Sequence, residues 1–595
     1  MTRVVVVGHG MVGSRFAEEL LHRAPGTVLT VLGAEEYEPY NRVLLSEVVA
    51  GAIDVASLTL PSSPVPTGRV LHGTTATRVD RERRTVVADD GEHHPYDVLV
   101  LATGARARIP EIRGLGADGV TSHRLPAGVH ALRTLDDARE IVAATVNARR
   151  AVVLGGGVLG LEVATGLARR GVRVTVVHAG PHLMDRQLGP EAAAAAAQGL
   201  RRVGVDQLVG AMTEEVLLRD GALRGVRVRT AGGSTAGGNT AGGAAAAATL
   251  EADLLVLTAG TIPETGLAVR AGLAVGRGIV VSTDCTTSDP AVFAIGDCAE
   301  PPEGGTGLIA QGWDQARRLA MLLSAASVQG GSSTPEPSTG STPTAHPSTA
   351  HPPTAHPPNT DVVRLKAHGI EVVTMGLSGS QALDPPPGTR AVRLSDPSGG
   401  RHVEVLVRAG IVVGATAVGA GKVGVDLVTL YTRRTPTPTD PAQLLLTPVA
   451  GVGPGDAAAE PSPTLMPDRA TVCRCNGVTK GDIVACWRQG ARTVADVTRT
   501  TRATTGCGGC TDAVCGIVEW LQRSDPQSQS RVPVSPPVPV PAQPQPQPHR
   551  ESQSGPEPEP QPEPGPQPGH PDADGALDDP PLRHPAGVEP VASPA

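Results

Sequence analysis

One short pattern occurs twice in the chain and restricts its fold more than any other feature. It is an apolar run followed by glycines in Gly-x-Gly-x-x-Gly spacing, found as VVVVGHGMVG at 4–13 and as AVVLGGGVLG at 151–160. The first glycine permits a tight turn, the second lets a pyrophosphate approach the backbone, and the third lets a helix pack closely on a strand. The two copies predict two Rossmann-like dinucleotide-binding domains and an α/β fold class.

Each copy is followed by a helix-like segment and a second apolar strand, whose end approaches the ribose of a dinucleotide in such folds. After the first copy, VLTVLGAE ends at Glu35, where a carboxylate can accept hydrogen bonds from both ribose hydroxyls. After the second copy, VRVTVVH ends at His178, and Arg186 is the nearby cation. For a nicotinamide dinucleotide at this second fold, the histidine leaves NADH and NADPH both open, and the lack of an arginine cluster favours NADH.

Low-complexity stretches divide the rest of the chain. Residues 329–361 repeat TAHP three times, and residues 523–595 hold 22 of the 56 prolines. Neither stretch has enough apolar side chains to offset the conformational entropy of folding, so both are predicted to be disordered. The Gly/Ala-rich residues 230–249 lie between two strand-like segments, which predicts an expanded loop inside a domain.

Charge and hydropathy exclude two classes of partner. The formal net charge is -8, and residues 523–595 contribute -6 of it through ten acidic and four basic side chains. The remainder lacks the concentrated basic face that nucleic-acid binding requires. No apolar run reaches the ~18 residues of a membrane span, and the N-terminal segment lacks the long apolar core of a signal peptide. We therefore expect a cytoplasmic protein that binds neither nucleic acid nor membrane.

Four of the eight cysteines form two tight pairs, Cys473 with Cys475 and Cys507 with Cys510. Disulfides are disfavoured in the cytosol, so these thiols are expected to bind a metal. Four thiolates suit both zinc and iron-sulfur clusters, and spacing alone leaves that choice open.

Three further segments make residues 1 to about 325 resemble the FAD- and NAD(P)-dependent pyridine nucleotide oxidoreductases: EPYNRVLLSE at 38–47, YDVLVLATGA at 96–105 and VFAIGDCAE at 292–300. The resemblance implies that the first fold binds FAD and that the second, inserted between halves of the first, binds NAD(P)H. The residues that it places near FAD are Gly8, Gly10, Gly13, Glu35, Arg42, Thr103, Gly104, Gly296 and Asp297. Those that it places near NAD(P)H are Gly155, Gly157, Gly160 and His178.

Glu162, two residues beyond the third glycine of the second copy, is the catalytic candidate. The same resemblance places it near the nicotinamide and flavin rings, and a helix-surface carboxylate is the alternative. The disulfide-reducing branches of the family need cysteines that this chain lacks, since none precedes Cys285. Cys285 and Cys298 are expected to be packing residues.

Residues 470–517 resemble a bacterioferritin-associated-ferredoxin-like module, which is a small helical [2Fe-2S] domain. This implies Cys473, Cys475, Cys507 and Cys510 as cluster ligands. Zinc cannot change oxidation state, whereas an iron cluster accepts single electrons from a flavin that has taken up a hydride, so iron is favoured. Cys486 and Cys515 are expected to be packing residues or neighbours of the cluster.

The domain order resembles the N-terminal half of the NAD(P)H nitrite reductase large subunit and the assimilatory nitrate reductase electron-transfer subunit. The predicted divisions are an FAD-binding domain at 1–115 and 251–328, an NAD(P)-binding domain at 116–250, a linker at 329–361, a small α+β domain at 362–445, a linker at 446–468, the [2Fe-2S] domain at 469–522 and a tail at 523–595. After Cys510 the chain has only Cys515, so the cysteines expected for a [4Fe-4S] and sirohaem half are missing.

The resemblance therefore implies an NAD(P)H-dependent oxidoreductase that passes electrons through FAD and a [2Fe-2S] cluster to a separate nitrate or nitrite reductase. Two alternatives stay open: a reductase of a ferredoxin- or rubredoxin-like carrier, and a non-enzymatic iron- or redox-sensing protein. The sequence also leaves the oligomeric state open, with a homodimer among the options.

Overall fold

The computed structural model describes residues 1–60, 68–115, 125–230, 234–235, 238–239, 246–328, 361–446, 463, 466–473, 478–504 and 510–524. The predicted disordered linker and tail lie outside the described residues except at their ends, and so do Cys475 and Cys507. None of the described helices combines the length and the apolar composition needed to traverse a lipid bilayer.

The first glycine motif opens a five-stranded parallel sheet in the order β21-β7-β1-β2-β3. Its strands are β1 (Arg3–Val7), β2 (Val28–Gly33), β3 (Gly68–His72), β7 (Val98–Leu101) and β21 (Val292–Ala294). The chain leaves this sheet after β7 and returns to it with β21, which is the insertion that the sequence predicts.

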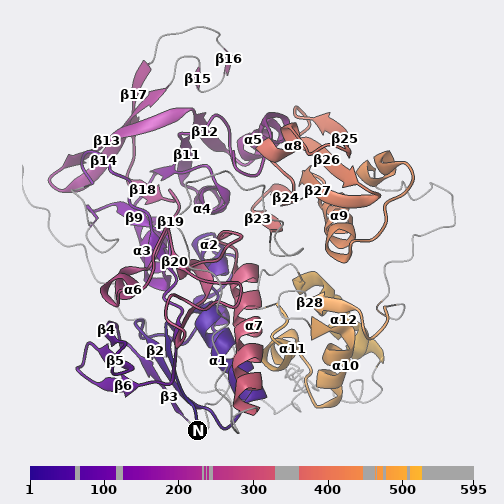
Figure 1. Cartoon of the computed structure of the whole chain (residues 1–595). Helices are drawn as coiled ribbons and strands as arrows, with labels where there is room; N and C mark the ends of the chain where they lie inside the picture. Colours follow the sequence, from indigo (N-terminus) through magenta and orange to yellow (C-terminus); the bar gives the residue numbers. More distant parts are fainter. Residues whose placement is uncertain are drawn as a thin grey trace, which may run out of the picture. The chain divides into compact units, whose positions relative to one another are not determined.

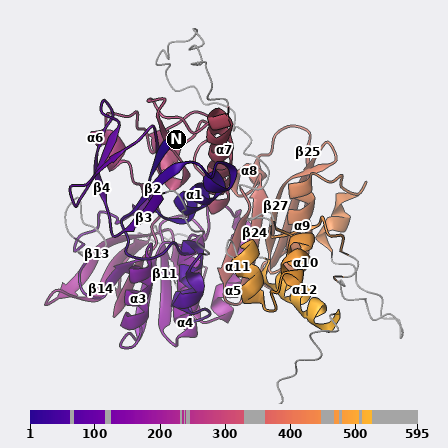
Figure 2. The ribbon, with the colours of Figure 1, turned by 90° about the horizontal axis from the view of Figure 1, so that it is seen from below.

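Both faces of this sheet are buried, which explains the uninterrupted valines of β1. Val4 and Val6 pack with Phe16 on the side covered by α1 (Met11–Arg23) and α7 (Ile309–Val328). These two helices lie side by side in both views (Figures 1 and 2). Val5 and Val7 face the opposite side. That side is completed by a three-stranded sheet of β4 (Ala76–Asp80), β5 (Thr85–Ala88) and β6 (His93–Pro95), and by α6 (Gly266–Arg270).

The second glycine motif opens another five-stranded parallel sheet, in the order β12-β11-β10-β18-β9. Its strands are β9 (Val129–Ala131), β10 (Arg150–Leu154), β11 (Arg173–His178), β12 (Val205–Val209) and β18 (Leu254–Leu257). β18 lies beyond residue 250, where the sequence analysis ended the NAD(P)-binding domain, and its pairing with β10 places this strand in the second sheet instead. One side packs on α3 (Leu135–Ala144), α4 (Val158–Arg169) and α5 (Pro190–Arg202). The other packs on a three-stranded antiparallel sheet of β13 (Ala211–Arg219), β14 (Ala222–Thr230) and β17 (Ala246–Glu251).

The Gly/Ala-rich stretch lies between β14 and β17 in the sequence. Because β14 pairs with β17, this stretch connects two neighbouring strands of one sheet. Two short strands, β15 (Ser234–Thr235) and β16 (Gly238–Asn239), pair within it. The fold class is therefore α/β with two Rossmann-like sheets, as the doubled motif predicts.

A third sheet is antiparallel, in the order β23-β24-β27-β26-β25. It comprises β23 (Val363–Ala367), β24 (Ile370–Gly376), β25 (Thr389–Asp396), β26 (Arg401–Arg408) and β27 (Ile411–Val418), with the helices α8 (Ser380–Leu383) and α9 (Gly421–Arg433). α9 packs on β24 and β27, which makes this an α+β unit.

The C-terminal module is helical, with a short β28–β29 pair at its start. Its elements are β28 (Thr471–Cys473), β29 (Val478–Thr479), α10 (Lys480–Arg488), α11 (Val494–Thr501) and α12 (Thr511–Ser524). Thr479 with Asp482 and Thr493 with Asp496 form capping boxes that fix where α10 and α11 begin. Trp487 is buried in the core of the module, and Trp520 packs against that core.

The remaining elements are short: η1 (Arg42–Leu44), α2 (Leu45–Val49), η2 (Val55–Leu58), β8 (Ala105–Ala107), β19 (Thr261–Pro263), β20 (Ile279–Val280), η4 (Gly296–Cys298), β22 (Ala299–Glu300) and η5 (Pro441–Leu445).

Candidate functional site

The first glycine turn has the geometry that a dinucleotide loop requires. Gly8 has φ +113°, and a Cβ there would lie 2.1 Å from the Ala102 carbonyl oxygen. A Cβ at Gly13 would lie 2.0 Å from the Gly8 carbonyl oxygen. At Gly10 the nearest heavy atom to such a Cβ is Arg42 Nε, 4.0 Å away. Gly8 and Gly13 therefore serve the fold, whereas Gly10 leaves space for a ligand.

The second glycine turn repeats this geometry. Gly155 has φ +123°, and its Cβ would lie 2.6 Å from the Thr258 carbonyl oxygen. A Cβ at Gly160 would lie 1.8 Å from the Gly155 carbonyl oxygen, while a Cβ at Gly157 would meet no heavy atom of the described residues within 4 Å. In both folds, the middle glycine is the one that faces open space.

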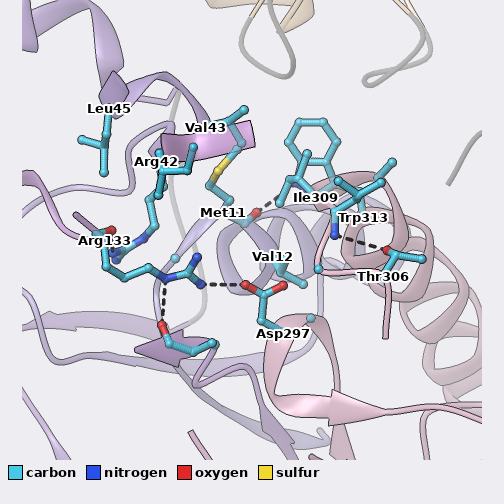
Figure 3. A pocket seen from close by; sticks show the side chains of 18 of the residues that line it. Met11, Val12, Arg42, Val43, Leu45, Arg133, Asp297, Thr306, Ile309 and Trp313 are labelled. Carbon is cyan, nitrogen blue, oxygen red and sulfur yellow. Dashed lines mark hydrogen bonds and ion pairs between the residues drawn. The ribbon is translucent and has the colours of Figure 1, made fainter. Parts of the chain in front are cut away.

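The first turn lies on a cavity of about 1490 Å³ (Figure 3). Among the residues predicted to hold FAD, those that line it are Gly8, Gly10, Glu35, Arg42, Thr103, Gly104, Gly296 and Asp297. Gly13 is not a lining residue but packs against the Gly8 carbonyl. None of the residues predicted to bind NAD(P)H is among the lining residues, although Val158 and Leu159, the first two residues of α4, are.

Arg42 is held at the cavity by two partners from its own loop. Its guanidinium forms an ion pair with Glu35 and lies 4.7 Å from the centre of the Tyr40 ring. The Tyr40 hydroxyl donates to the second Glu35 oxygen at 2.8 Å and accepts from the Leu135 backbone N–H at 2.9 Å. Burial is the main cause that raises the pKa of Tyr40, so it stays a neutral donor.

A second cation, Arg133, also lines the cavity, and the sequence analysis did not identify it. Arg133 donates to Asp297 at 2.6 Å and to the Ala105 carbonyl at 2.8 Å (Figure 3). Its one sequence signal is its place before Thr134, the N-cap of α3. The Arg42 side chain also contacts the Arg133 backbone, since Arg42 Nη1 donates to the Arg133 carbonyl oxygen at 3.4 Å, and both arginines line the cavity. Two guanidinium groups beside an open glycine turn fit a pyrophosphate.

One wall of the cavity is apolar and includes the indole ring of Trp313. Trp313 is 4% exposed, packs with Met11, and donates from Nε1 to the Met11 carbonyl at 3.2 Å. Val43 and Ile309 adjoin this cluster (Figure 3). One cavity therefore has an open glycine turn, two arginine side chains and an apolar wall. This combination fits a flavin nucleotide.

His9, inside the glycine turn, is a further group that sequence reasoning did not single out. Its Nδ1 is buried and has no hydrogen-bond partner among the residues that the structure describes, and its ring lies 5.2 Å from that of His72. Burial, with a smaller effect of His72, lowers the pKa of His9 to about 4. The imidazole is therefore neutral in the folded protein at neutral pH.

This shift predicts a pH dependence of stability. Because the pKa of His9 is lower in the folded state than its usual 6.5, its contribution is complete above pH 6.5 and is lost as the pH falls towards 4. The loss should be on the order of 2 kcal/mol, and His9→Gln should flatten this part of the profile. Urea unfolding of both proteins at intervals between pH 7 and pH 4 measures the effect. Parallel profiles would contradict it.

Glu162 is buried, at 5% exposure, rather than on a helix surface. Its carboxylate accepts from Ser46 Oγ at 2.6 Å and from the Lys366 backbone N–H at 3.0 Å. The Lys366 ammonium lies 3.9 Å from Glu162 and donates to the Val43 carbonyl at 2.6 Å. Glu162 and Lys366 both line the cavity. With both oxygens engaged by the protein, Glu162 can anchor the elements around the cavity.

We predict that Glu162→Ala lowers the free energy of unfolding by about 2–4 kcal/mol, because Ser46 and Lys366 lose a buried charged acceptor. Glu162→Gln, which keeps an acceptor oxygen, should change the rate of flavin reduction by less than about threefold, as expected for an anchoring residue. Urea unfolding and anaerobic stopped-flow absorbance measure the two effects. A hundredfold slower reduction in a stable Glu162→Gln variant would instead indicate a catalytic role.

Two of the four predicted cluster ligands are described, and both are buried. Cys473 ends β28 at 1% exposure, and Cys510 precedes α12 at 7%. The Thr504 backbone N–H lies 3.2 Å from Cys510 Sγ, a contact of the kind that stabilises a thiolate. Both cysteines line the same cavity as Gly10 and Trp313.

The other described cysteines lie in hydrophobic clusters or helices. Cys285, Cys298 and Cys486 are buried at 2%, 0% and 4% exposure, and Cys515 is partly buried in α12. Burial raises the pKa of Cys285 to about 11 and also raises the pKa of Cys298, so both thiols are protonated and poorly nucleophilic.

The two nucleotide turns, the shared cavity and the buried cysteine module define a flavin-type reductase with an attached metal centre. Residues 2–330 match the model of the pyridine nucleotide-disulphide oxidoreductases, and the chain belongs to this family. Residues 471–520 match the model of the BFD-like [2Fe-2S] binding domain. These matches imply FAD, NAD(P)H and a [2Fe-2S] cluster as cofactors.

Curated relatives cover most of this chain. Nitrite reductase [NAD(P)H] of Bacillus subtilis (strain 168) is 30% identical over 88% of this chain and 58% of its own length. The assimilatory nitrate reductase electron transfer subunit of the same organism is 29% identical over 88% of this chain and 60% of its own. The chain thus spans about three-fifths of the length of each of these two relatives.

Among solved structures, the covalent putidaredoxin reductase–putidaredoxin complex is similar, with a TM-score of 0.58 and 25% identity. The match covers 76% of this chain and 97% of the other. A ferredoxin reductase from Rhodopseudomonas palustris, at 23% identity and a TM-score of 0.54, shares the fold over 70% of this chain and 91% of its own.

Proposed function

We propose that this protein is an NAD(P)H-dependent electron-transfer oxidoreductase that delivers electrons through FAD and a [2Fe-2S] cluster to a separate nitrate or nitrite reductase in the cytoplasm. The observation that carries the proposal is the shared cavity, which is lined by Gly10 and Trp313 of the flavin fold and by Cys473 and Cys510 of the cluster module. A flavin and a cluster held by these residues would border the same cavity, which would favour direct transfer of single electrons between them.

The chemistry that bound FAD supplies is acceptance of a hydride and release of its electrons one at a time. The chain's residues bind and orient. Arg42 and Arg133 offer guanidinium groups to the pyrophosphate of FAD. Gly10 leaves room for that pyrophosphate, and Gly157 leaves room for the pyrophosphate of NAD(P)H. Trp313 and Met11 present apolar surface that excludes water. Hydride transfer requires close alignment and no protein acid or base, so positioning carries the catalysis.

The relatives supply the proposed acceptor. Similarity to a nitrite reductase and to a nitrate reductase electron transfer subunit extends over 88% of this chain, including the third sheet and the cluster module. Both relatives are named for the reduction of inorganic nitrogen oxyanions. We therefore propose a nitrate or nitrite reductase on a separate chain as the electron acceptor.

The test is reconstitution with a terminal reductase. The purified, reconstituted protein is mixed anaerobically with a sirohaem nitrite reductase or a molybdenum nitrate reductase, and NAD(P)H oxidation is followed together with loss of nitrite or nitrate. We expect both signals only when the two proteins are present together. NAD(P)H oxidation by ferricyanide with no transfer to either terminal reductase would contradict the proposed acceptor.

A second candidate is a reductase of a small redox carrier. It is favoured by 32% identity over 50% of this chain to a rubredoxin-NAD(+) reductase of Pseudomonas putida and by the likeness to the putidaredoxin reductase complex. Rapid reduction of rubredoxin or ferredoxin, without transfer to the terminal reductases, would support this candidate. A protein that oxidises no NAD(P)H with any acceptor would instead fit a redox sensor.

A further inference from the structure

The turn after β11, at residues 179–188, folds back over the second glycine loop. Met184 donates its backbone N–H to the Gly156 carbonyl at 2.8 Å and has a left-handed φ of 49°. Met184 is 1% exposed, so its place in the core fixes the residue that follows, Asp185.

His178, at the end of β11, is already engaged by the protein. The Gly156 N–H donates to His178 Nδ1 at 3.2 Å, so the neutral ring carries its proton on Nε2. That nitrogen lies 3.5 Å from Asp185 Oδ1. His178 therefore lies between the glycine loop and Asp185, with Nδ1 directed at Gly156 and Nε2 directed at Asp185.

The registers of the two parallel sheets identify the position that matches Glu35. In the first fold Val7, just before Gly8, pairs with Leu32, and Glu35 lies three residues after Leu32. In the second fold Leu154, just before Gly155, pairs with Val177. Three residues after Val177 the chain has Gly180, which has no side chain to meet a ribose.

Asp185 occupies the space that this glycine leaves. A Cβ built at Gly180 would lie 2.3 Å from Asp185 Oδ2 and 2.6 Å from His178 Nε2. The Asp185 side chain is 35% exposed, so its carboxylate is accessible to a ligand. A carboxylate thus stands where the first fold has Glu35, although it comes from a position later in the chain.

We propose that Asp185 binds the adenosine ribose hydroxyls of the nicotinamide cofactor and makes the protein selective for NADH over NADPH. Both ribose hydroxyls can donate to a carboxylate, whereas the 2′-phosphate of NADPH would bring a second negative charge against it. This inference rests on the proposed use of a nicotinamide cofactor. It concerns which cofactor is used and does not involve the electron acceptor.

Arg186 is the residue that works against this selectivity. It is exposed and adjacent to Asp185, so it is the nearest cation in the described turn that could attract a 2′-phosphate. Arg186→Gln is therefore the matched control. It changes one charge at the neighbouring position and leaves the carboxylate in place.

The experiment measures anaerobic flavin reduction against NADH and NADPH concentration for the wild type, Asp185→Asn and Arg186→Gln. We expect the wild type to prefer NADH by about 100-fold in kcat/KM. Asp185→Asn should raise KM for NADH by about 10-fold with kcat unchanged, and should reduce the preference to about 10-fold or less. Arg186→Gln should change KM for NADH by less than about threefold. Full FAD content verifies that each variant is folded.

A wild type that prefers NADPH, or an Asp185→Asn variant that keeps the full preference for NADH, would overturn the inference. Binding of ADP-ribose and of its 2′-phosphorylated form, measured by calorimetry, gives a readout that needs no turnover. Tighter binding of ADP-ribose that is lost in Asp185→Asn would support the role of Asp185 even if neither nicotinamide reduces the flavin and the proposed function fails. Equal binding of the two nucleotides to the wild type would overturn it.

Discussion

Cys510→Ser should abolish the [2Fe-2S] signal and slow electron delivery to an external one-electron acceptor by at least about 100-fold, while NAD(P)H still bleaches the flavin. Serine lacks the soft thiolate that the cluster requires, and Cys510 lies at the cavity that the cluster would share with FAD. Low-temperature EPR, iron analysis and cytochrome c reduction measure the three effects.

Cys515→Ser is the matched control, because Cys515 lies five residues further along, within α12, and is only partly buried. It should keep both the signal and the activity. An unchanged EPR signal in Cys510→Ser would show that Cys510 is not a ligand. Zinc in place of iron in a freshly isolated wild-type protein would remove the electron-transfer role of the module.

The second prediction with a large effect uses two substitutions, Gly10→Ala and Gly157→Ala, to distinguish the FAD site from the NAD(P)H site. Gly10 and Gly157 have φ of -83° and -82°, which alanine adopts readily, and a Cβ at either position meets no atom closer than 4.0 Å in the part of the chain that the structure describes. Gly10→Ala should therefore change the free energy of unfolding of the FAD-free protein by less than about 1 kcal/mol. It should weaken FAD binding by at least about 10-fold, since the methyl group would occupy the approach of the pyrophosphate.

Gly157→Ala should retain FAD and raise KM for the nicotinamide nucleotide by a similar factor. Gly13→Ala is the contrasting control, because its Cβ would lie 2.0 Å from a backbone oxygen. That variant should lose about 3 kcal/mol of stability or more. FAD content after gel filtration, urea unfolding and steady-state kinetics measure these outcomes. A fully flavinated Gly10→Ala variant, or loss of FAD in Gly157→Ala, would contradict this assignment of the sites.

The sequence predicted the parts of the fold whose requirements are local. Gly8, Gly10 and Gly13 lie within six residues of one another, and their roles follow from the turn between β1 and α1. The valines of β1 and the paired cysteines are similarly informative, because a doubly buried strand or a metal site limits residue type at short spacing.

Residues that reach the cavity through tertiary structure gave no such signal. Arg133 meets Asp297 across 164 positions of sequence, and Trp313 meets Met11 across 302. Lys366 reaches Val43 across 323 positions. An arginine, a tryptophan or a lysine in isolation has many surface and core roles, and only the folded chain brings these three to one site.

Asp185 is an intermediate case. The sequence directed attention to His178 because it ends the strand, and the structure places that imidazole against Gly156 instead. The carboxylate beside Gly180 depends on the left-handed turn at Met184, which spacing does not predict.

The central claim is that electrons pass from NAD(P)H through FAD to a [2Fe-2S] cluster in this chain. The measurement that tests it most directly is an anaerobic titration of the reconstituted protein with NADH and then NADPH, with flavin absorbance and low-temperature EPR recorded on the same samples. We predict flavin bleaching accompanied by a reduced [2Fe-2S] signal. A flavin that stays oxidised with both nucleotides, or a bleached flavin beside a cluster that is never reduced, would contradict the account.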